Sequence, residues 1–486
     1  MVMKKKLNFI IVFALCFFSM QSIADFKKIK SACHLLSAAQ IEDINKVVVH
    51  YSQLDNGLKV YIVENHRLPL FSLQLVFNVG AADELTGQSG YAHLFEHLMF
   101  KGSNNVADGE HFAAIRNVGG NVNASTDYDK TRYWSEAPID SLDRVLWLEA
   151  ERLQHLSITQ KKLKNQQQAV LEEKLLRIDN VPYFKIASEF MVSAWQGTDY
   201  DHLIIGTKDD INRATVKQVN YFFERYYQPD NAILVLVGDV QVDSALQKIK
   251  FYFSRINRPD SQKVHRQVKK KNKLLKGKSE RHYDPLAPFP LYALGWHTIG
   301  KKDEDFYAVE LLTDILFKYD NARLKHVLIE DKQLAFALIG MPLGFEQFGI
   351  SVMGIVPHSY ADFGQIKSAV KIQLERIQHE GVSPSELCAV KKYQQIKIIR
   401  KMSNNKEMAE LIADGVFFFN EPRHAIDALS AYQRVDNQQI KRMAKKYFHH
   451  DWLALEIVPG PGMRFLKWFM EILPRGISQS IEQKIL

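Results

Sequence analysis

The alternation of apolar and polar positions predicts strands early in the chain and helices between and after them. VVVHYSQL and LKVYIV flank Asp55-Asn56-Gly57, and Asn-Gly between alternating runs is typical of a β-hairpin. Residues 71–79 form another predicted strand, and a strand pair is expected to flank Gly119-Gly120 and end in TRYWSEA. Helices are expected at residues 90–100, 139–177 and 216–227, before a buried strand at residues 231–239.

Residues 255–281 mark the clearest boundary, because they are rich in Lys and Arg and poor in large apolar residues. We interpret them as a solvated interdomain linker, with a basic patch that touches anionic membrane or substrate as the alternative. Beyond them PLYALGWHT resembles FSLQLVFNV, and YAVELLTDILFK resembles YAHLFEHLMFK with a one-residue offset. The sequence therefore predicts an α+β fold of two related, mixed α/β, sandwich-like halves, at residues 45–254 and 282–460, followed by a tail at 461–486.

The first residues have the layout of a secretory signal peptide. Three lysines at positions 4–6 precede an apolar run that ends near Met20, and Ser22-Ile23-Ala24 offers small residues for cleavage. We predict a signal peptide at residues 1–24 and an exported protein, periplasmic or secreted. An uncleaved anchor is the alternative, although the run is short for a membrane span.

Composition narrows the class of protein without deciding its function. With 486 residues, 46% hydrophobic and 24% charged, the chain can build more than one core. Cleavage after Ala24 would lower the formal charge from +8 to +5 (8 − 3), a surplus that does not argue for nucleic acid. Cys33 and Cys388 would remain, and because two cysteines make no framework we expect them to be unpaired.

His93-Leu94-Phe95-Glu96-His97 carries the candidate chemistry. Residues four apart lie on one face of a helix, so both imidazoles can reach one metal ion, and Glu96 borders the same face. Two imidazoles suit Zn²⁺, with a third protein ligand and a water. Zinc would lower the pKa of the water, and a carboxylate would take its proton and pass it to the leaving amine. On the pentapeptide alone, two ordinary core or surface histidines remain the alternative.

A third ligand is expected on another element. QQQAVLEEKLLRIDN is helical in pattern and contains Glu172 and Glu173. Adjacent helical residues point about 100° apart, so one of the two glutamates faces the metal and the other faces solvent.

The sequence resembles the family of pitrilysin, insulin-degrading enzyme and mitochondrial processing peptidase, the inverted-motif zinc peptidases. The resemblance is densest in GQSGYAHLFEHLMFKGS, GGNVNASTDYDKTRYW, KNQQQAVLEEKLLRIDN and FFERYYQPDNAILVLVGD. It implies that His93 and His97 bind zinc, that Glu96 is the general base and that Glu173 is the third ligand. It also implies that Asn123 and Ala124 line the strand to which an extended peptide adds, although Asn123 could be an ordinary turn residue. Gln166 stands where some members have an acid, and would support the site by a hydrogen bond.

One departure concerns the second half. Long family members place an Arg and a Tyr, seven residues apart, against the substrate, and here Ile329 and Phe336 occupy those places. Neither can donate a hydrogen bond. Short members work as two-chain assemblies, so we expect a homodimer or heterodimer with a related subunit that supplies the Arg and Tyr. Arg323 could substitute, although a surface ion pair is the simpler expectation.

The predicted function is zinc-dependent endopeptidase activity on peptides or unfolded segments. The alternative is a catalytically silent or partner-dependent subunit that presents substrate or scaffolds a two-chain peptidase. An exported binding protein with an accidental motif would leave the downstream glutamate and the surrounding motifs unexplained. Neither nucleic acid nor a stable membrane span after cleavage is expected.

Overall fold

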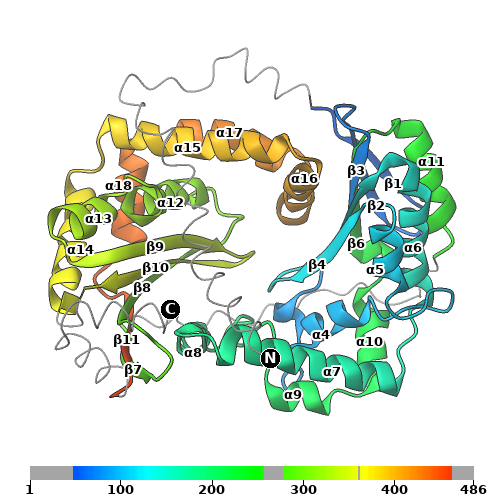
Figure 1. Cartoon of the computed structure of the whole chain (residues 1–486). Coiled ribbons are helices and arrows are strands. Elements are labelled where there is room, and N and C mark those ends of the chain that lie inside the picture. Colours follow the sequence, from blue (N-terminus) through cyan, green and yellow to red (C-terminus); the bar gives the residue numbers. More distant parts are fainter. Residues whose placement is uncertain (1–46, 257–276, 359–361, 462–486) are drawn as a thin grey trace, which may run out of the picture.

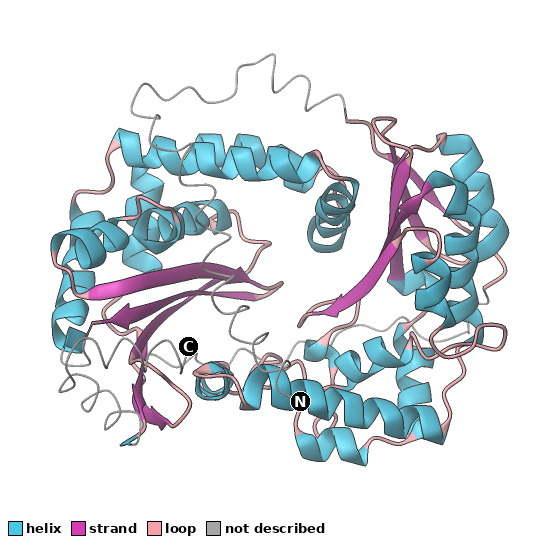
Figure 2. Cartoon of the chain, in the orientation of Figure 1, coloured by secondary structure: helices cyan, strands magenta, loops and turns pink. Residues whose placement is uncertain are grey.

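Two β-sheets, one in each half of the chain, organise the protein, as Figure 1 shows. The computed structural model describes residues 47–256, 277–358 and 362–461. The sheets lie on opposite sides of the molecule, and helices pack on the outer side of each (Figure 2). This arrangement confirms the predicted α+β fold of two mixed α/β halves.

The first sheet has the strand order β1-β2-β6-β3-β5-β4. Its strands are β1 (His50–Gln53), β2 (Lys59–Glu64), β3 (Leu70–Phe77), β4 (Asn121–Thr126), β5 (Thr131–Pro138) and β6 (Ala232–Gly238). β6 runs parallel to β2 and antiparallel to β3, and all of its residues are buried because both of its faces are covered. β4 pairs with β5 and forms one edge of the sheet.

Helices of the first half pack mostly on the outer face of this sheet. They are α4 (Tyr91–Leu98), α5 (Glu110–Arg116), α6 (Leu142–His155), α7 (Gln160–Lys174), α8 (Phe184–Ala194), α9 (Lys208–Arg213), α10 (Val216–Tyr226) and α11 (Val242–Phe253). α7 continues into a π-helical turn, Leu175–Asp179. α10 begins at a capping box in which Thr215 and Gln218 satisfy each other's backbone N–H groups.

The second half repeats the topology of the first. Its sheet has the order β7-β11-β8-β10-β9, with β7 (Ser279–Asp284), β8 (Leu291–Ile299), β9 (Ala335–Gly344), β10 (Phe348–Pro357) and β11 (Leu453–Pro459). Its helices are α12 (Phe306–Thr313), α13 (Arg323–Lys325), α14 (Phe363–His379), α15 (Pro384–Met402), α16 (Asn405–Phe419), α17 (His424–Arg434) and α18 (Asn437–Tyr447). β7 and β11 are parallel, as β2 and β6 are. α18 also begins at a capping box, Asp436 with Gln439, so the predicted relationship between the halves is confirmed.

Each half covers the inner face of the other half's sheet. α16, from the second half, packs on the first sheet, and its Ile412 is fully buried. α8, from the first half, packs on the second sheet, with Trp195 and Phe190 against Phe348 and Leu453. Because both of these inner-face clusters contain side chains from the two halves, burial of apolar surface holds the halves together as one body.

The predicted first hairpin is confirmed, and the predicted strand pair around Gly119-Gly120 is corrected. The hairpin around Asn56-Gly57 is β1–β2, with Gly57 at φ +93°. The pair that ends in TRYWSEA does not flank Gly119-Gly120, because the residues before it form α5 and the pair turns at residues 127–130. Gly119, at φ +80°, ends α5 through a bond from its N–H to the carbonyl of Arg116.

Several sequence predictions concern segments beyond the described residues: the signal peptide 1–24, most of the linker (257–276) and nearly all of the tail (462–486). The second half begins earlier than predicted, because Ser279–Arg281 already belong to β7 and pair with β11. Cys388, in α15, is disulfide-bonded. The expectation that it is unpaired is therefore wrong; Cys33 lies outside the described residues.

Candidate metal centre

α4 presents His93, Glu96 and His97 from a firmly held N-terminus. Gly90 precedes the helix at φ +88°, and a side chain there would meet the carbonyl oxygen of Ile205 at 2.7 Å. The buried Glu84 carboxylate accepts hydrogen bonds from the N–H groups of Gly90 (2.8 Å) and Ala92 (2.7 Å). A carboxylate at a helix N-terminus satisfies free backbone N–H donors and complements the helix dipole. Glu84 therefore holds the start of the helix that carries His93, Glu96 and His97.

Glu173, in α7, meets both histidines. Its Oε2 lies 3.6 Å from His93 Nε2 and 3.2 Å from His97 Nε2. Zn²⁺ held tetrahedrally by bonds of about 2.0–2.1 Å would set its ligand atoms about 3.3 Å apart. The two distances from Glu173 are close to this spacing. His93, His97 and Glu173 are the group of possible metal-binding side chains found in the described part of the chain, with their ligand atoms within 4.8 Å of one another.

The electrostatics of the three side chains suit a cation. Burial, with His97 nearby, lowers the pKa of His93 to about 4, so this imidazole is neutral near pH 7, as a ligand must be. The hydrogen bond with His97 lowers the pKa of Glu173, and His93 and Arg177 act in the same direction against the effect of burial. Two imidazoles and one carboxylate are a donor set that zinc accepts.

Glu96 lies beside this group and is held by a residue of the edge strand. The hydroxyl of Thr126, the last residue of β4, donates a 2.5 Å hydrogen bond to Glu96 Oε2. Burial raises the pKa of Glu96, and the Thr126 bond opposes that rise by favouring the carboxylate. An acid with its pKa moved toward neutrality suits proton transfer near pH 7.

The group opens into a pocket of about 930 Å³. Asn123 and Ala124 of β4 line it, and Asn123 Oδ1 accepts a hydrogen bond from the N–H of Ala124 at 2.9 Å. Part of the remaining lining is apolar and comes from α8 and the segment before α9: Phe184, Leu203, Ile204 and Ile205. The pocket therefore combines a strand edge, a candidate metal group and an apolar wall.

Three further side chains on or just after α7, Glu172, Gln166 and Arg177, lie outside the group of candidate ligands. Glu172 lines the pocket but is not part of the three-residue group. Gln166 is buried, and its amide donates to Asn165 Oδ1 at 2.5 Å rather than to one of the three candidate ligands. Arg177 Nη1 lies 2.8 Å from Glu173 Oε1. The sequence analysis did not predict this ion pair, although i, i+4 spacing on a helix is a signal for it. The hydrogen bond between Thr126 and Glu96 was not predicted from the sequence either.

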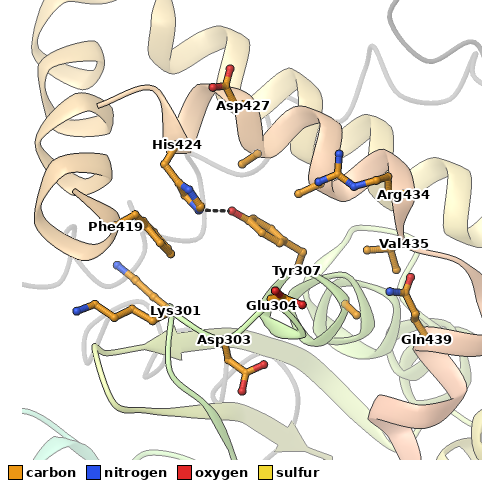
Figure 3. A pocket seen from close by; sticks show the side chains of 14 residues that line it. Lys301, Asp303, Glu304, Tyr307, Phe419, His424, Asp427, Arg434, Val435 and Gln439 are labelled. Carbon is orange, nitrogen blue, oxygen red and sulfur yellow. Dashed lines mark hydrogen bonds between the residues drawn. The ribbon is translucent and has the colours of Figure 1, made fainter. Parts of the chain in front are cut away.

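The second half contains Ile329 and Phe336, the two side chains that depart from the family pattern. Ile329 packs against the second core, and Phe336 is 59% exposed with its ring 3.8 Å from that of His358. Arg323 forms an ion pair with Glu386, the simpler of the two roles expected for it. A further pocket, of about 530 Å³, lies against α12 and α17, where Tyr307 and His424 share a 2.8 Å hydrogen bond (Figure 3). None of the predicted site residues lines this second pocket.

Comparison with known proteins identifies the family. Residues 59–207 match the insulinase family (peptidase family M16), and residues 213–393 match the domain described as "Peptidase M16 inactive domain". The chain belongs to this family, in its two-domain type, and the predicted resemblance is confirmed.

Curated relatives include both peptidases and a subunit of a complex. The zinc protease PqqE of Helicobacter pylori is 28% identical over 402 residues, 81% of this chain and 89% of the relative. Subunit 1 of the mitochondrial cytochrome b-c1 complex of Rattus norvegicus is 21% identical over 406 residues, 82% of this chain and 83% of the relative. Relatives named zinc proteases support a peptidase-like function that uses zinc.

Solved structures share the fold. A protease from Helicobacter pylori superposes with a TM-score of 0.80 at 25% identity, over 85% of this chain and all of the other. The periplasmic protease PqqL from Escherichia coli superposes with a TM-score of 0.70 at 19% identity, over 90% of this chain and 50% of the other. Within the described residues, no helix is long and apolar enough to cross a membrane.

Proposed function

We propose that this chain is an exported zinc-dependent endopeptidase that cleaves peptides or unfolded protein segments, with Glu96 as general base. The observation that carries the proposal is the meeting of His93, His97 and Glu173 from two helices, with Glu96 beside them. Relatives named zinc proteases support the same reaction class.

His93 Nε2, His97 Nε2 and a carboxylate oxygen of Glu173 would hold the zinc ion. When bound, zinc supplies Lewis-acid activation of a water and of the scissile carbonyl. Glu96 removes the proton of the attacking water and returns it to the nitrogen of the leaving amine. Because Thr126 occupies Glu96 Oε2, the proton is carried on Oε1.

Substrate binding is assigned to the free edge of β4. An extended peptide adds to a strand edge through main-chain hydrogen bonds, and these do not depend on sequence. Asn123 and Ala124 lie on this strand, at the pocket. Peptides and unfolded segments readily supply an extended segment, so they are the proposed substrate class. Gln166 would contribute only by packing within α7, given its bond to Asn165.

A related second subunit completes the proposed enzyme. Ile329 and Phe336 offer no donor for the substrate carbonyl, so a homodimer or heterodimer in which the partner supplies an Arg and a Tyr would restore it. A partner-dependent or silent subunit is the second candidate function. It is favoured by the relative that is a subunit of the cytochrome b-c1 complex. Export to the periplasm or the medium agrees with the solved periplasmic protease PqqL.

Cleavage of an internally quenched peptide mixture by the zinc-loaded mature chain tests the proposal. We expect turnover that vanishes in Glu96→Gln while one zinc per chain is retained. Glu224→Gln, at an exposed side chain of α10 outside the pocket, is the matched control and should leave turnover unchanged. Turnover that survives in Glu96→Gln would contradict the role of Glu96. Zinc binding without turnover in the wild type would favour the partner-dependent subunit, and full activity of a monomer would exclude it.

A further inference from the structure

The turn between β4 and β5, residues 127–130, is held by the second half of the chain. Asp129 is buried, and its Oδ2 accepts a 2.8 Å hydrogen bond from the N–H of Glu346, in the β9–β10 turn. Its Oδ1 accepts a 2.8 Å bond from the hydroxyl of Tyr200. Lys130, only 5% exposed, forms an ion pair with Asp414 of α16. Two separate elements of the second half therefore fix this turn.

The ion pair is strongly anchored. Lys130 Nζ lies 5.2 Å and 4.7 Å from the ring centroids of Phe417 and Phe418, beyond Asp414 on α16. Desolvation opposes the ionisation of Asp414, but Lys130 and Lys301 outweigh it and lower its pKa to about 2. Removing one partner from such a pair leaves an uncompensated charge in a poorly solvated place, which is costly. The turn consequently has one well-defined position relative to α16.

The same turn directly follows Thr126, the residue that hydrogen-bonds Glu96 Oε2. The turn closes locally as well, since the N–H groups of Asp129 and Lys130 both donate to Asp127 Oδ1 at 2.7 Å and 2.8 Å. A shift of the turn would therefore move Thr126, and with it the carboxylate that Thr126 orients. A misplacement of about 1 Å in a catalytic group can lower a rate by roughly a hundredfold.

We infer that Thr126 is a positioning residue for Glu96, and that the second half of the chain sets its place through the Lys130–Asp414 pair and the Asp129–Glu346 bond. The inference rests on the proposed function and extends it, because it gives the half without metal ligands a part in catalysis. Thr126 does not itself touch the reacting atoms; it acts through the carboxylate of Glu96.

Steady-state kinetics of the zinc-loaded full chain test the first step. We expect Thr126→Val to lower kcat by roughly 10- to 100-fold, with KM within about twofold and zinc at one per chain. Thr126→Ser keeps the hydroxyl, and it should restore most of the lost kcat. A Thr126→Val protein with wild-type kcat, or a serine variant as slow as the valine variant, would overturn the role of Thr126.

Hydrogen–deuterium exchange of residues 121–131 tests the second step without requiring activity. We expect Asp414→Asn, and the milder Lys130→Met, to speed exchange there by about tenfold and to lower kcat. Asn405→Ala is the matched control, because it removes a bond between the halves at the other end of α16, from Asn65 to Asn405 (2.6 Å). Exchange at residues 121–131 that is equal in all four proteins would overturn the coupling. Absent turnover in the wild type would count against the proposed function, and the exchange result would still decide the coupling.

Discussion

Gln394 of α15 donates a 2.6 Å hydrogen bond to Asp314, in the turn that extends α12. In the repeated topology α12 corresponds to α4, which carries His97, and α15 corresponds to α7, which carries Glu173. The Gln394–Asp314 bond therefore lies where the candidate metal ligands lie in the first half. Nearby, Lys397 pairs with Glu310 at 3.4 Å. Where the first half gathers candidate metal ligands, the second half has a buried hydrogen-bonded ion cluster.

Replacing Asp314 by Asn should stabilise the protein at neutral and alkaline pH. Burial, with Glu310 nearby, raises the pKa of Asp314 from 3.8 to about 7. Between these values the unfolded chain releases the proton and the folded chain keeps it, so stability falls as pH rises to about 7 and then stays low. Asn keeps an acceptor for Gln394 without the charge.

Thermal unfolding of Asp314→Asn at pH 4 and pH 8 checks this sign. We expect a melting temperature several degrees above wild type at pH 8 and a much smaller difference at pH 4. Asp320→Asn, at an acid that is 59% exposed, is the control and should change little at either pH. A gain of equal size at both pH values would show that ionisation of Asp314 is not the cause.

Zinc stoichiometry should distinguish the two adjacent glutamates of α7. Glu173→Ala removes one of three donor atoms, and we expect it to lose most bound zinc after dialysis against a weak chelator. Glu172→Ala should retain one zinc per chain, since Glu172 stands outside the donor group. Metal analysis by plasma mass spectrometry measures both proteins, and equal retention would contradict the assignment of Glu173.

The packing of α16 on the first sheet should make the two halves unfold together. Ile412 is fully buried in that interface, and Ile412→Ala should lower the free energy of unfolding by about 2–5 kcal/mol. Ile372→Ala, at a side chain that is 45% exposed, should cost about 0.5 kcal/mol or less. Urea titrations followed by tryptophan fluorescence and circular dichroism would show two transitions if the halves were independent.

The edge of β4 should affect substrate binding more than chemistry. Asn123 lines the pocket, whereas Asn121 on the same strand does not. We expect Asn123→Ala to raise KM by about three- to tenfold with a smaller change in kcat, and Asn121→Ala to leave both near wild type. If both variants behave alike, the strand contributes through its backbone alone.

The sequence by itself determined what depends on short spacing along the chain. The i, i+4 relation put His93 and His97 on one face of a helix, Asn56-Gly57 defined the first hairpin, and similar runs on either side of the linker revealed the repeat. Each of these follows from helix or strand geometry acting over a few residues. The residues alone did not decide whether Glu172 or Glu173 is the third metal ligand, and the family resemblance favoured Glu173.

Only the tertiary structure decided which distant residues meet. The packing of α7 against α4 places Glu173, and not Glu172, within 3.6 Å of both histidines. Pairing of β4 with β5 brings Thr126 to Glu96, and α16 covers the sheet of the other half. Cys388 is bonded although its spacing gave no sign of it. These relationships arise from the burial of apolar surface between elements far apart in sequence, which no local periodicity encodes.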